Sequence, residues 1–140
     1  AASPDGRFVG AWLYRAGQSG GYAHGQGAFV LLRTADGEPL AALTLDPRVG
    51  LSDFAWSPAS TLVAHTVWEG SGPTAARRAV VRDALTARIV LERDGRFAGW
   101  SPDGEWIYVA RDEGLFADRV DGSGGVRVSP FGVPVSATRP

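Results

Sequence analysis

The two histidines are the first side chains to consider for metal binding or proton transfer. His24 lies in a glycine-rich segment and His65 lies in an apolar run over residues 62–67. The sequence has no His-x-x-x-His pair and no two-histidine, one-carboxylate spacing, so it predicts no metal site. His65 has the same parity as Val63, which places both on one side of a strand. We therefore expect His65 to be a hydrogen-bonded histidine on the buried or channel-facing side.

Carboxylates and serines are the other candidates for catalysis. Four acids gather toward the end of the chain: Asp112, Glu113, Asp118 and Asp121. Residues 121–124 partly resemble a calcium loop, but the Asp-x-Asp-x-Asp-Gly spacing is missing, and we interpret these acids as residues of solvated turns. Ser57, Ser71 and Ser101 stand outside any Gly-x-Ser-x-Gly elbow. The sequence thus predicts no catalytic residue and no cofactor.

The most unusual segment is the glycine-rich stretch over residues 16–27. Its amides would suit an anion, but no Gly-x-Gly-x-x-Gly follows a strand and opens a helix, which argues against a phosphate site. Two interpretations remain: a solvated hairpin loop, and a flexible loop that presents polar side chains to a protein partner. The candidate partner-binding residues are Gln18, Tyr22, His24 and Gln26.

Composition excludes several functions. The formal net charge is −1 and all 14 basic residues are arginine, so nothing attracts nucleic acid or an anionic membrane. We interpret one small group of arginines as a solvated edge: Arg77, Arg78, Arg82 and Arg88. The absence of cysteine excludes disulfides and thiolate nucleophiles. No apolar stretch approaches the ~20 residues of a membrane span, so we expect no membrane insertion.

An internal repeat defines the elements that would position these side chains. Ser3-Pro4-Asp5-Gly6 recurs in full as Trp100-Ser101-Pro102-Asp103-Gly104, and in part as Trp56-Ser57-Pro58-Ala59-Ser60. The spacing is close to the ~40–50 residues of one four-stranded propeller blade. Proline cannot donate to a strand ladder and Asp-Gly favours a turn, so the motif predicts a strand end followed by a tight turn. The middle copy lacks Asp-Gly, and we expect its turns to be looser.

Each repeat contains further predicted strands. An apolar strand opens in register after each turn, at Phe8, Leu62 and Trp106. A second pair of strands follows in each repeat, over residues 28–33 and 39–45, 78–83 and 88–92, and 115–120 and 125–129. Asp36-Gly37 and Asp121-Gly122 predict the turns of two of these hairpins. No stretch has a convincing helical period, so the chain is predicted to be all-β.

Together these features resemble the WD40-like propeller repeat of TolB and its relatives, in which Trp-Ser-Pro-Asp-Gly links the innermost strand to the next. The resemblance covers nearly the whole chain. It implies a single β-propeller segment of about three four-stranded antiparallel blades, with approximate repeats at residues 1–50, 51–95 and 96–131. Residues 132–140 would start a further strand or form a tail. Trp56 and Trp100 would then pack between neighbouring sheets and not serve as platforms for a ligand.

Blade topology predicts two faces with different connections. The turns between the first and second and between the third and fourth strands lie on one face, and the remaining connections lie on the other. The connections on this other face differ in length: the shortest is residues 112–114, the next is residues 69–76, and the longest is residues 16–27. Variable loops on a rigid scaffold often carry recognition, so the rim with these connections is the candidate binding face.

The propeller scaffold hosts protein binders, sugar-processing enzymes and peptidase gating domains, so the resemblance leaves function open. We expect a non-enzymatic module for protein–protein interaction. Its expected location is exported, periplasmic or associated with a bacterial cell envelope, with a cytoplasmic location as the alternative. A second hypothesis is the gating propeller of a prolyl-oligopeptidase-like hydrolase. A third is a structural subunit of a larger assembly.

Three blades are too few to close a ring, because propellers have four to eight. Open sheet faces and edges promote association. The chain has no initiating methionine and no signal peptide, and it looks processed or excised from a longer one. We therefore expect a longer chain, further copies of this one, or another protein to complete the propeller.

Overall fold

The computed structural model describes residues 2–14, 27–44, 49–69 and 76–129, and the regular elements within them are all strands. The first sheet contains β1 (Phe8–Tyr14), β2 (Gly27–Arg33) and β3 (Pro39–Thr44). The second sheet contains β4 (Val49–Trp56), β5 (Leu62–Glu69), β6 (Ala76–Asp83) and β7 (Ile89–Asp94). The third sheet contains β8 (Arg96–Trp100), β9 (Trp106–Arg111), β10 (Gly114–Arg119) and β11 (Gly125–Ser129). The predicted all-β architecture is confirmed.

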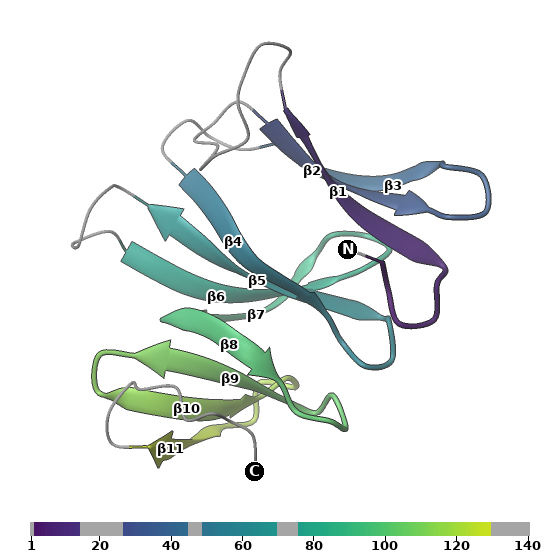
Figure 1. Ribbon diagram of the computed structural model, residues 1–140. Helices are drawn as coiled ribbons and strands as arrows, with labels where there is room; N and C mark the ends of the chain where they lie inside the picture. The colour runs from purple at the N-terminus through teal and green to yellow at the C-terminus, as the bar shows by residue number, and fades with distance from the viewer. Residues whose placement is uncertain (1, 15–26, 45–48, 70–75, 130–140) are drawn as a thin grey trace.

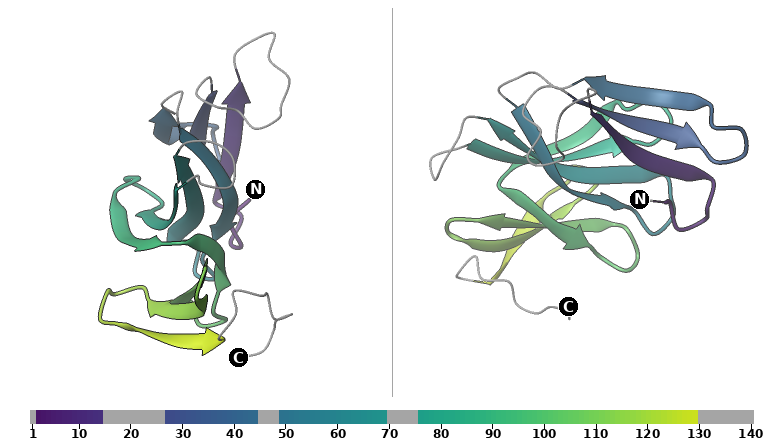
Figure 2. Two further views of the ribbon diagram at one scale, coloured as in Figure 1. Left: turned by 90° about the vertical axis from the view of Figure 1, so that its left-hand side faces the viewer. Right: turned by 45° about the horizontal axis from the view of Figure 1, so that its top comes forward.

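Every sheet is an antiparallel meander in which each strand pairs with its neighbour in sequence. The three sheets follow one another in space in chain order, with the second sheet between the other two (Figure 1). Figure 2 shows the same order from two other sides. Within the described residues, no helix is long and apolar enough to span a membrane.

The second sheet is buried on both faces because successive side chains of a strand point to opposite sides. On β5, Val63 packs in a cluster with the first sheet, and Ala64 packs in a cluster with the third sheet. The cluster between the first and second sheets contains Phe8, Leu31, Trp56, Val63 and Ala84. The cluster between the second and third sheets contains Ala64, Ala79, Val81, Leu91, Phe97, Ile107 and Val109.

The predicted turn chemistry is confirmed, but the prediction of looser turns in the middle repeat is wrong. The backbone N–H of Ser60 donates to the Ser57 carbonyl at 2.9 Å. In the other two repeats, the N–H groups of Gly6 and Gly104 donate to the equivalent carbonyls of Ser3 and Ser101. Ser60 and Ala87 take φ values of 64° and 62° in positions where other repeats have glycine. These non-glycine residues pay a steric cost, yet the surrounding hydrogen bonds keep the same turn geometry.

The first sheet differs from the other two in the number of its strands. The second and third sheets have four strands, whereas the described part of the first sheet has three. Ala2 forms an isolated antiparallel bridge with Val9, in the position where Trp56 pairs with Val63 in the second sheet. The place of an innermost strand is therefore marked by a single bridge.

The link between the second and third sheets depends on Gly95, which separates β7 from β8. Its φ is +120°, a value that side chains rarely adopt. A Cβ atom at this position would lie 2.7 Å from the Ala110 carbonyl oxygen and 2.7 Å from Val109 Cγ1. The chain can pass this close to β9 only with a glycine.

We predict that Gly95→Ala lowers the free energy of unfolding by about 3 kcal/mol or more, because backbone strain and overpacking add. Chemical denaturation followed by tryptophan fluorescence measures this loss. Gly122→Ala is the matched control: Gly122 also has a positive φ, of 80°, but a Cβ there meets nothing within 4 Å. The control should cost only about 1 kcal/mol, and equal losses would contradict the steric argument.

Candidate functional site

A buried serine organises the tight turn that leads into β1, β5 or β9. The Ser3 N–H donates to the Phe8 carbonyl at 2.8 Å, and the Ser3 hydroxyl accepts the Phe8 N–H at 3.0 Å. The same pair of bonds links Ser57 with Leu62 and Ser101 with Trp106. Because these hydroxyls hold the backbone, they are structural groups and not poised nucleophiles. Ser71 lies outside the described residues.

These turns share one face with the β2–β3, β6–β7 and β10–β11 hairpin turns, and we call it the turn face. The N–H groups of Thr34, Ala84 and Val120 donate to the carbonyls of Arg7, Thr61 and Glu105, at 2.9, 3.0 and 2.9 Å. Neighbouring sheets also touch here, because the Asp5 N–H donates to Ser60 Oγ at 3.0 Å. Hydrogen bonds therefore stabilise the turn face both within each sheet and between neighbouring sheets.

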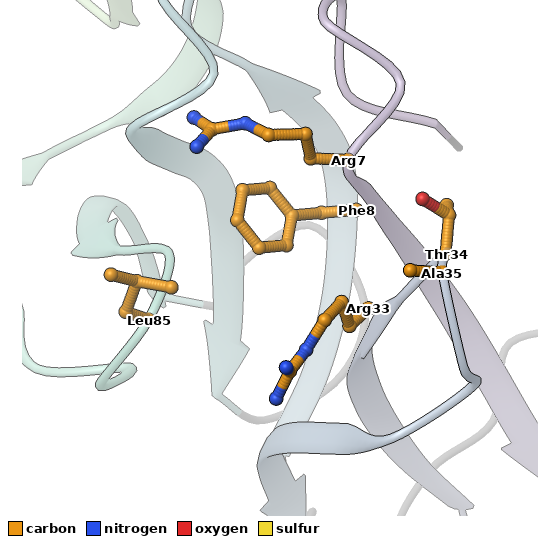
Figure 3. A pocket seen from close by; sticks show the side chains of 6 residues that line it. All are labelled: Arg7, Phe8, Arg33, Thr34, Ala35 and Leu85. Carbon is orange, nitrogen blue, oxygen red and sulfur yellow. The ribbon is translucent and has the colours of Figure 1, made fainter.

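A hollow of about 380 Å³ opens on the turn face between the first and second sheets. This first hollow is lined by Arg7, Phe8, Arg33, Thr34, Ala35 and Leu85. The buried Phe8 ring forms its floor and stacks on Trp56, with ring centroids 5.8 Å apart and an interplanar angle of 15°. Figure 3 shows the Arg7 and Arg33 side chains on either side of that ring, with Leu85 across the hollow.

The two arginines give the first hollow a basic lining. The Arg7 guanidinium lies 5.1 Å from the Phe8 ring centroid, and its Nε contacts Asp5 Oδ2 at 2.5 Å. Arg33 Nε lies 3.7 Å from Asp36 Oδ1. Both side chains remain accessible, with exposed fractions of 63% and 48%. A hydrogen bond from the backbone N–H of Arg7 helps to lower the pKa of Asp5 to about 2, so this carboxylate stays charged.

A second hollow of the same volume lies at the equivalent place between the second and third sheets. It is lined by Leu62, Val90, Glu105, Arg119, Val120 and Asp121. Two acids accompany its single arginine, so its lining has mixed charge. Two hollows with similar positions in the fold therefore differ in the charge of their lining: the first has only basic charged residues, and the second has both acidic and basic ones.

The predicted partner-binding residues Gln18, Tyr22, His24 and Gln26 lie outside the described residues. The two motif tryptophans lie between sheets. Trp56 is buried against Phe8 of the first sheet, and Trp100 packs beside the cluster between the second and third sheets. Trp100 Nε1 also donates to the Ala55 carbonyl across that interface at 3.2 Å.

His65 is fully buried between the first and second sheets, which confirms its predicted position. Its ring stacks on Phe54, with centroids 6.1 Å apart and an interplanar angle of 9°. Its Nε2 accepts a hydrogen bond from Arg82 Nε at 3.1 Å, so the neutral ring carries its proton on Nδ1. Burial, together with the nearby charge of Arg82, lowers the pKa of His65 to about 4.

The interpretation of all four C-terminal acids as turn residues is wrong for Asp118. Asp118 is a buried residue of β10 that accepts a hydrogen bond from Arg111 Nη2 at 3.1 Å. Its Oδ1 lies 3.6 Å from Nε of Arg93, which belongs to the second sheet. The spacing of residues along the sequence did not predict the contact between Asp118 and Arg93, because Arg93 belongs to a different sheet.

The expected basic edge of four arginines is not a single patch. Arg78 contacts Glu69 at 2.6 Å and Glu92 at 3.5 Å. Arg77 lies 3.5 Å from Asp112, and Arg82 faces His65. Neighbouring residues of β6 point to opposite sides of the sheet, which separates Arg77 from Arg78 and Arg82.

A polar network at the β4 bulge was not predicted from the sequence. Asp53, with a φ of 57°, accepts two hydrogen bonds from Arg96 of the third sheet at 2.9 and 3.0 Å. It also accepts the Thr66 hydroxyl at 2.8 Å, and Thr66 Oγ1 accepts the backbone N–H of Phe97 at 2.9 Å. Burial alone would raise the pKa of Asp53, but the hydrogen bonds from Arg96 and Thr66 outweigh it and lower the pKa. The sequence contains no signal for this network, because it depends on the positive φ of Asp53 and on a contact between two sheets.

Within the described residues, no group of three or more His, Asp or Glu side chains is arranged to hold a metal ion. The geometry instead consists of braced turns, two hollows and inter-sheet hydrogen bonds. Such an arrangement suits the presentation of a rigid surface.

No protein-family model and no curated protein matches the chain. Solved structures that resemble it in fold include the following two. Hydrazine synthase from Kuenenia stuttgartiensis matches with a TM-score of 0.55 and 15% identity, over 86% of this chain and 39% of that one. Dipeptidyl peptidase 4 from Porphyromonas gingivalis matches with a TM-score of 0.50 and 18% identity, over 96% of this chain and 19% of that one.

The matching regions are propeller domains. The chain is a partial β-propeller. It spans less than half the length of either matched protein, and at these identities the likeness shows the fold alone. The partial propeller places the two hollows at successive interfaces between its sheets.

The depressed pKa of His65 predicts that the fold weakens in mild acid. The unfolded chain binds a proton near pH 6.5 and the folded chain only near pH 4. The stabilisation is therefore complete above about pH 6.5 and is lost as the pH falls toward 4, by roughly 3 kcal/mol. Urea unfolding between pH 7 and pH 4.5 measures it.

His65→Gln, which keeps an acceptor for Arg82, should flatten this pH dependence. His24→Gln removes the other histidine of the chain and should leave the dependence unchanged. If the free energy of unfolding of the His65→Gln protein falls as steeply with decreasing pH, the assignment of this pH dependence to His65 is wrong.

Proposed function

We propose that this partial propeller is a non-enzymatic module for protein–protein interaction. One partner is a further sheet that continues the propeller beside the third sheet. The other binds at the rim that carries the long connections between strands. The TolB-like motif supports an exported or cell-envelope location for such a module.

The observation that carries the proposal is an exposed valine, Val126, on the outer face of the third sheet. Val126 pairs with Ala117 and Ala117 pairs with Tyr108, so these side chains share one face. Ile107 and Val109 alternate with Tyr108 and pack against the second sheet, so Val126 points away from it.

The second sheet shows what covers such a face. Leu91 of β7 pairs with Val81, just as Val126 of β11 pairs with Ala117. Leu91 is only 5% exposed because the third sheet packs over it, whereas Val126 is 56% exposed. A valine in this position suits coverage by another apolar sheet.

The rim opposite the turn face supports the second interaction. β9 and β10 are joined by only two residues, whereas β1 and β2 are joined by residues 15–26. Long connections between strands of a rigid scaffold are common sites of recognition. The predicted partner-binding residues Gln18, Tyr22, His24 and Gln26 belong to this connection.

The likeness to a dipeptidyl peptidase favours a second candidate function. In that case the chain would belong to a gating or substrate-access propeller of a prolyl-oligopeptidase-like hydrolase. A neighbouring domain with a Gly-x-Ser-x-Gly nucleophile elbow in the parent gene would distinguish this role from a free-standing interaction module.

We predict that the 140-residue chain associates in solution through the outer face of the third sheet. Val126→Lys should convert the associated species to monomers, because a charge on this face cannot be buried without a large desolvation cost. Sedimentation velocity across the micromolar range measures the distribution.

Ile89→Lys is the matched control, since Ile89 is an exposed apolar residue of β7 on a sheet that is already covered. This variant should associate like the unaltered chain. A stable, compact monomer for the unaltered chain would contradict the open-face argument.

Shortening the β1–β2 connection tests the rim. Replacing residues 17–26 by Asn-Gly leaves a four-residue connection between Tyr14 and Gly27, a length that is common in hairpins, so the thermal unfolding midpoint should stay nearly unchanged. Partners captured from an extract of the source cells and identified by mass spectrometry should disappear with the loop. An unchanged set of partners would remove this connection from the binding face.

A further inference from the structure

Leu85 is an exposed apolar residue that the packing of the fold does not explain. It lies in the β6–β7 turn, two residues after Asp83, with an exposed fraction of 58%. The equivalent positions in the other two hairpins, counted from the same turn hydrogen bond, are Ala35 and Asp121. Polar and small residues are the usual choice in such turns. A leucine here leaves more than half of its surface exposed and adds an apolar group to the surface.

The turn holds Leu85 in one place. Asp83 Oδ1 accepts the Leu85 N–H at 2.9 Å and the Thr86 N–H at 3.1 Å. Ala84, the residue just before Leu85, is buried in the cluster between the first and second sheets. On the other side, Arg82 Nη1 donates to the Ala87 carbonyl at 2.8 Å. An anchor that is already fixed loses little conformational entropy when it binds.

The surroundings of Leu85 combine apolar area with positive charge. Phe8 forms the floor of the first hollow, and Arg7 and Arg33 flank the ring (Figure 3). The residues that line this hollow include two arginines and no acid, whereas the second hollow has Glu105 and Asp121 beside Arg119. Asp5 and Asp36 each engage one arginine from outside the lining. A ligand with carboxylates can replace these exposed contacts at low cost.

We propose that the first hollow binds a short acidic segment of a partner protein. One apolar side chain of the segment packs between Phe8 and Leu85, and flanking Asp or Glu residues pair with Arg7 and Arg33. The apolar contact supplies most of the affinity, because buried apolar anchors dominate small interfaces. The arginines select acidic segments over basic ones and speed association. The second hollow has the wrong charge for the same segment.

This binding site is separate from both surfaces of the proposed function. The first hollow lies on the turn face, at the strand ends opposite those that residues 15–26 join, and between sheets that are already in contact. Loss of the loop over residues 17–26, or of association through Val126, leaves it unchanged. Its test therefore gives a result whether or not those interactions exist.

The test uses nine-residue peptides added to the ¹⁵N-labelled 140-residue chain. The acidic peptide has one central leucine flanked by alternating glutamate and serine. A second peptide has arginine in place of glutamate, and a third has serine in place of the leucine. We expect the acidic peptide to shift the amide signals of Phe8, Thr34, Ala35 and Leu85. The other two peptides should bind at least tenfold more weakly, and added salt should weaken the acidic peptide further.

Two variants and two matched controls locate the contacts. Leu85→Ser and Arg33→Glu should each reduce the affinity for the acidic peptide about tenfold or more, with an unchanged unfolding midpoint because both side chains are exposed. Val90→Ser, in the second hollow, and Arg88→Glu, an exposed arginine that lines neither hollow, should change it less than twofold. The proposal is overturned if the acidic peptide gives no shifts at millimolar concentration. It is also overturned if the arginine peptide binds equally well, or if Leu85→Ser binds like the unaltered chain.

Discussion

The packing of one twisted sheet on the next is the interaction on which the rest of this structure depends. Because the pleat alternates, a strand inside the second sheet contributes side chains to two interfaces. Val63 and His65 face the first sheet, and Ala64 and Thr66 face the third sheet. A sheet in this position cannot keep one polar face. This explains why β5 is buried along most of its length, and why the exposure of Val126 on the outer face of the third sheet is informative.

Some polar groups between the sheets find their partners in the neighbouring sheet. Asp53 of the second sheet binds Arg96 of the third sheet, and Arg93 of the second sheet lies close to Asp118 of the third. Removing charges from water costs much of what such pairs gain. These ion pairs contribute more to the relative orientation of the two sheets than to stability. Each pair can form only when the two sheets meet at one angle and one register.

The two faces of the propeller carry different connections between strands, and this difference organises its proposed roles. On the turn face, serine hydroxyls, aspartates and backbone bonds fix every described turn, so a hollow there keeps its shape before a ligand arrives. A preformed hollow suits a short peptide segment. The opposite rim carries connections of very different length, which suits a larger partner surface. Leu85 belongs to the first kind of site, because its turn is held by Asp83 and Arg82.

The sequence by itself determined the strands, their order and the turns, because each depends on neighbours along the chain. The Ser-Pro motif ends a strand, Asp-Gly closes a hairpin, and alternation identified the buried side of His65. Only the tertiary structure decided which strands share an interface, since residues such as Arg93 and Asp118 meet across two sheets. It also decided that Ser60 and Ala87 keep tight turns without glycine, because hydrogen bonds from outside each turn compensate for their positive φ. The first hollow was hidden for the same reason: Arg7, Phe8, Arg33 and Leu85 come together only when the first sheet packs on the second.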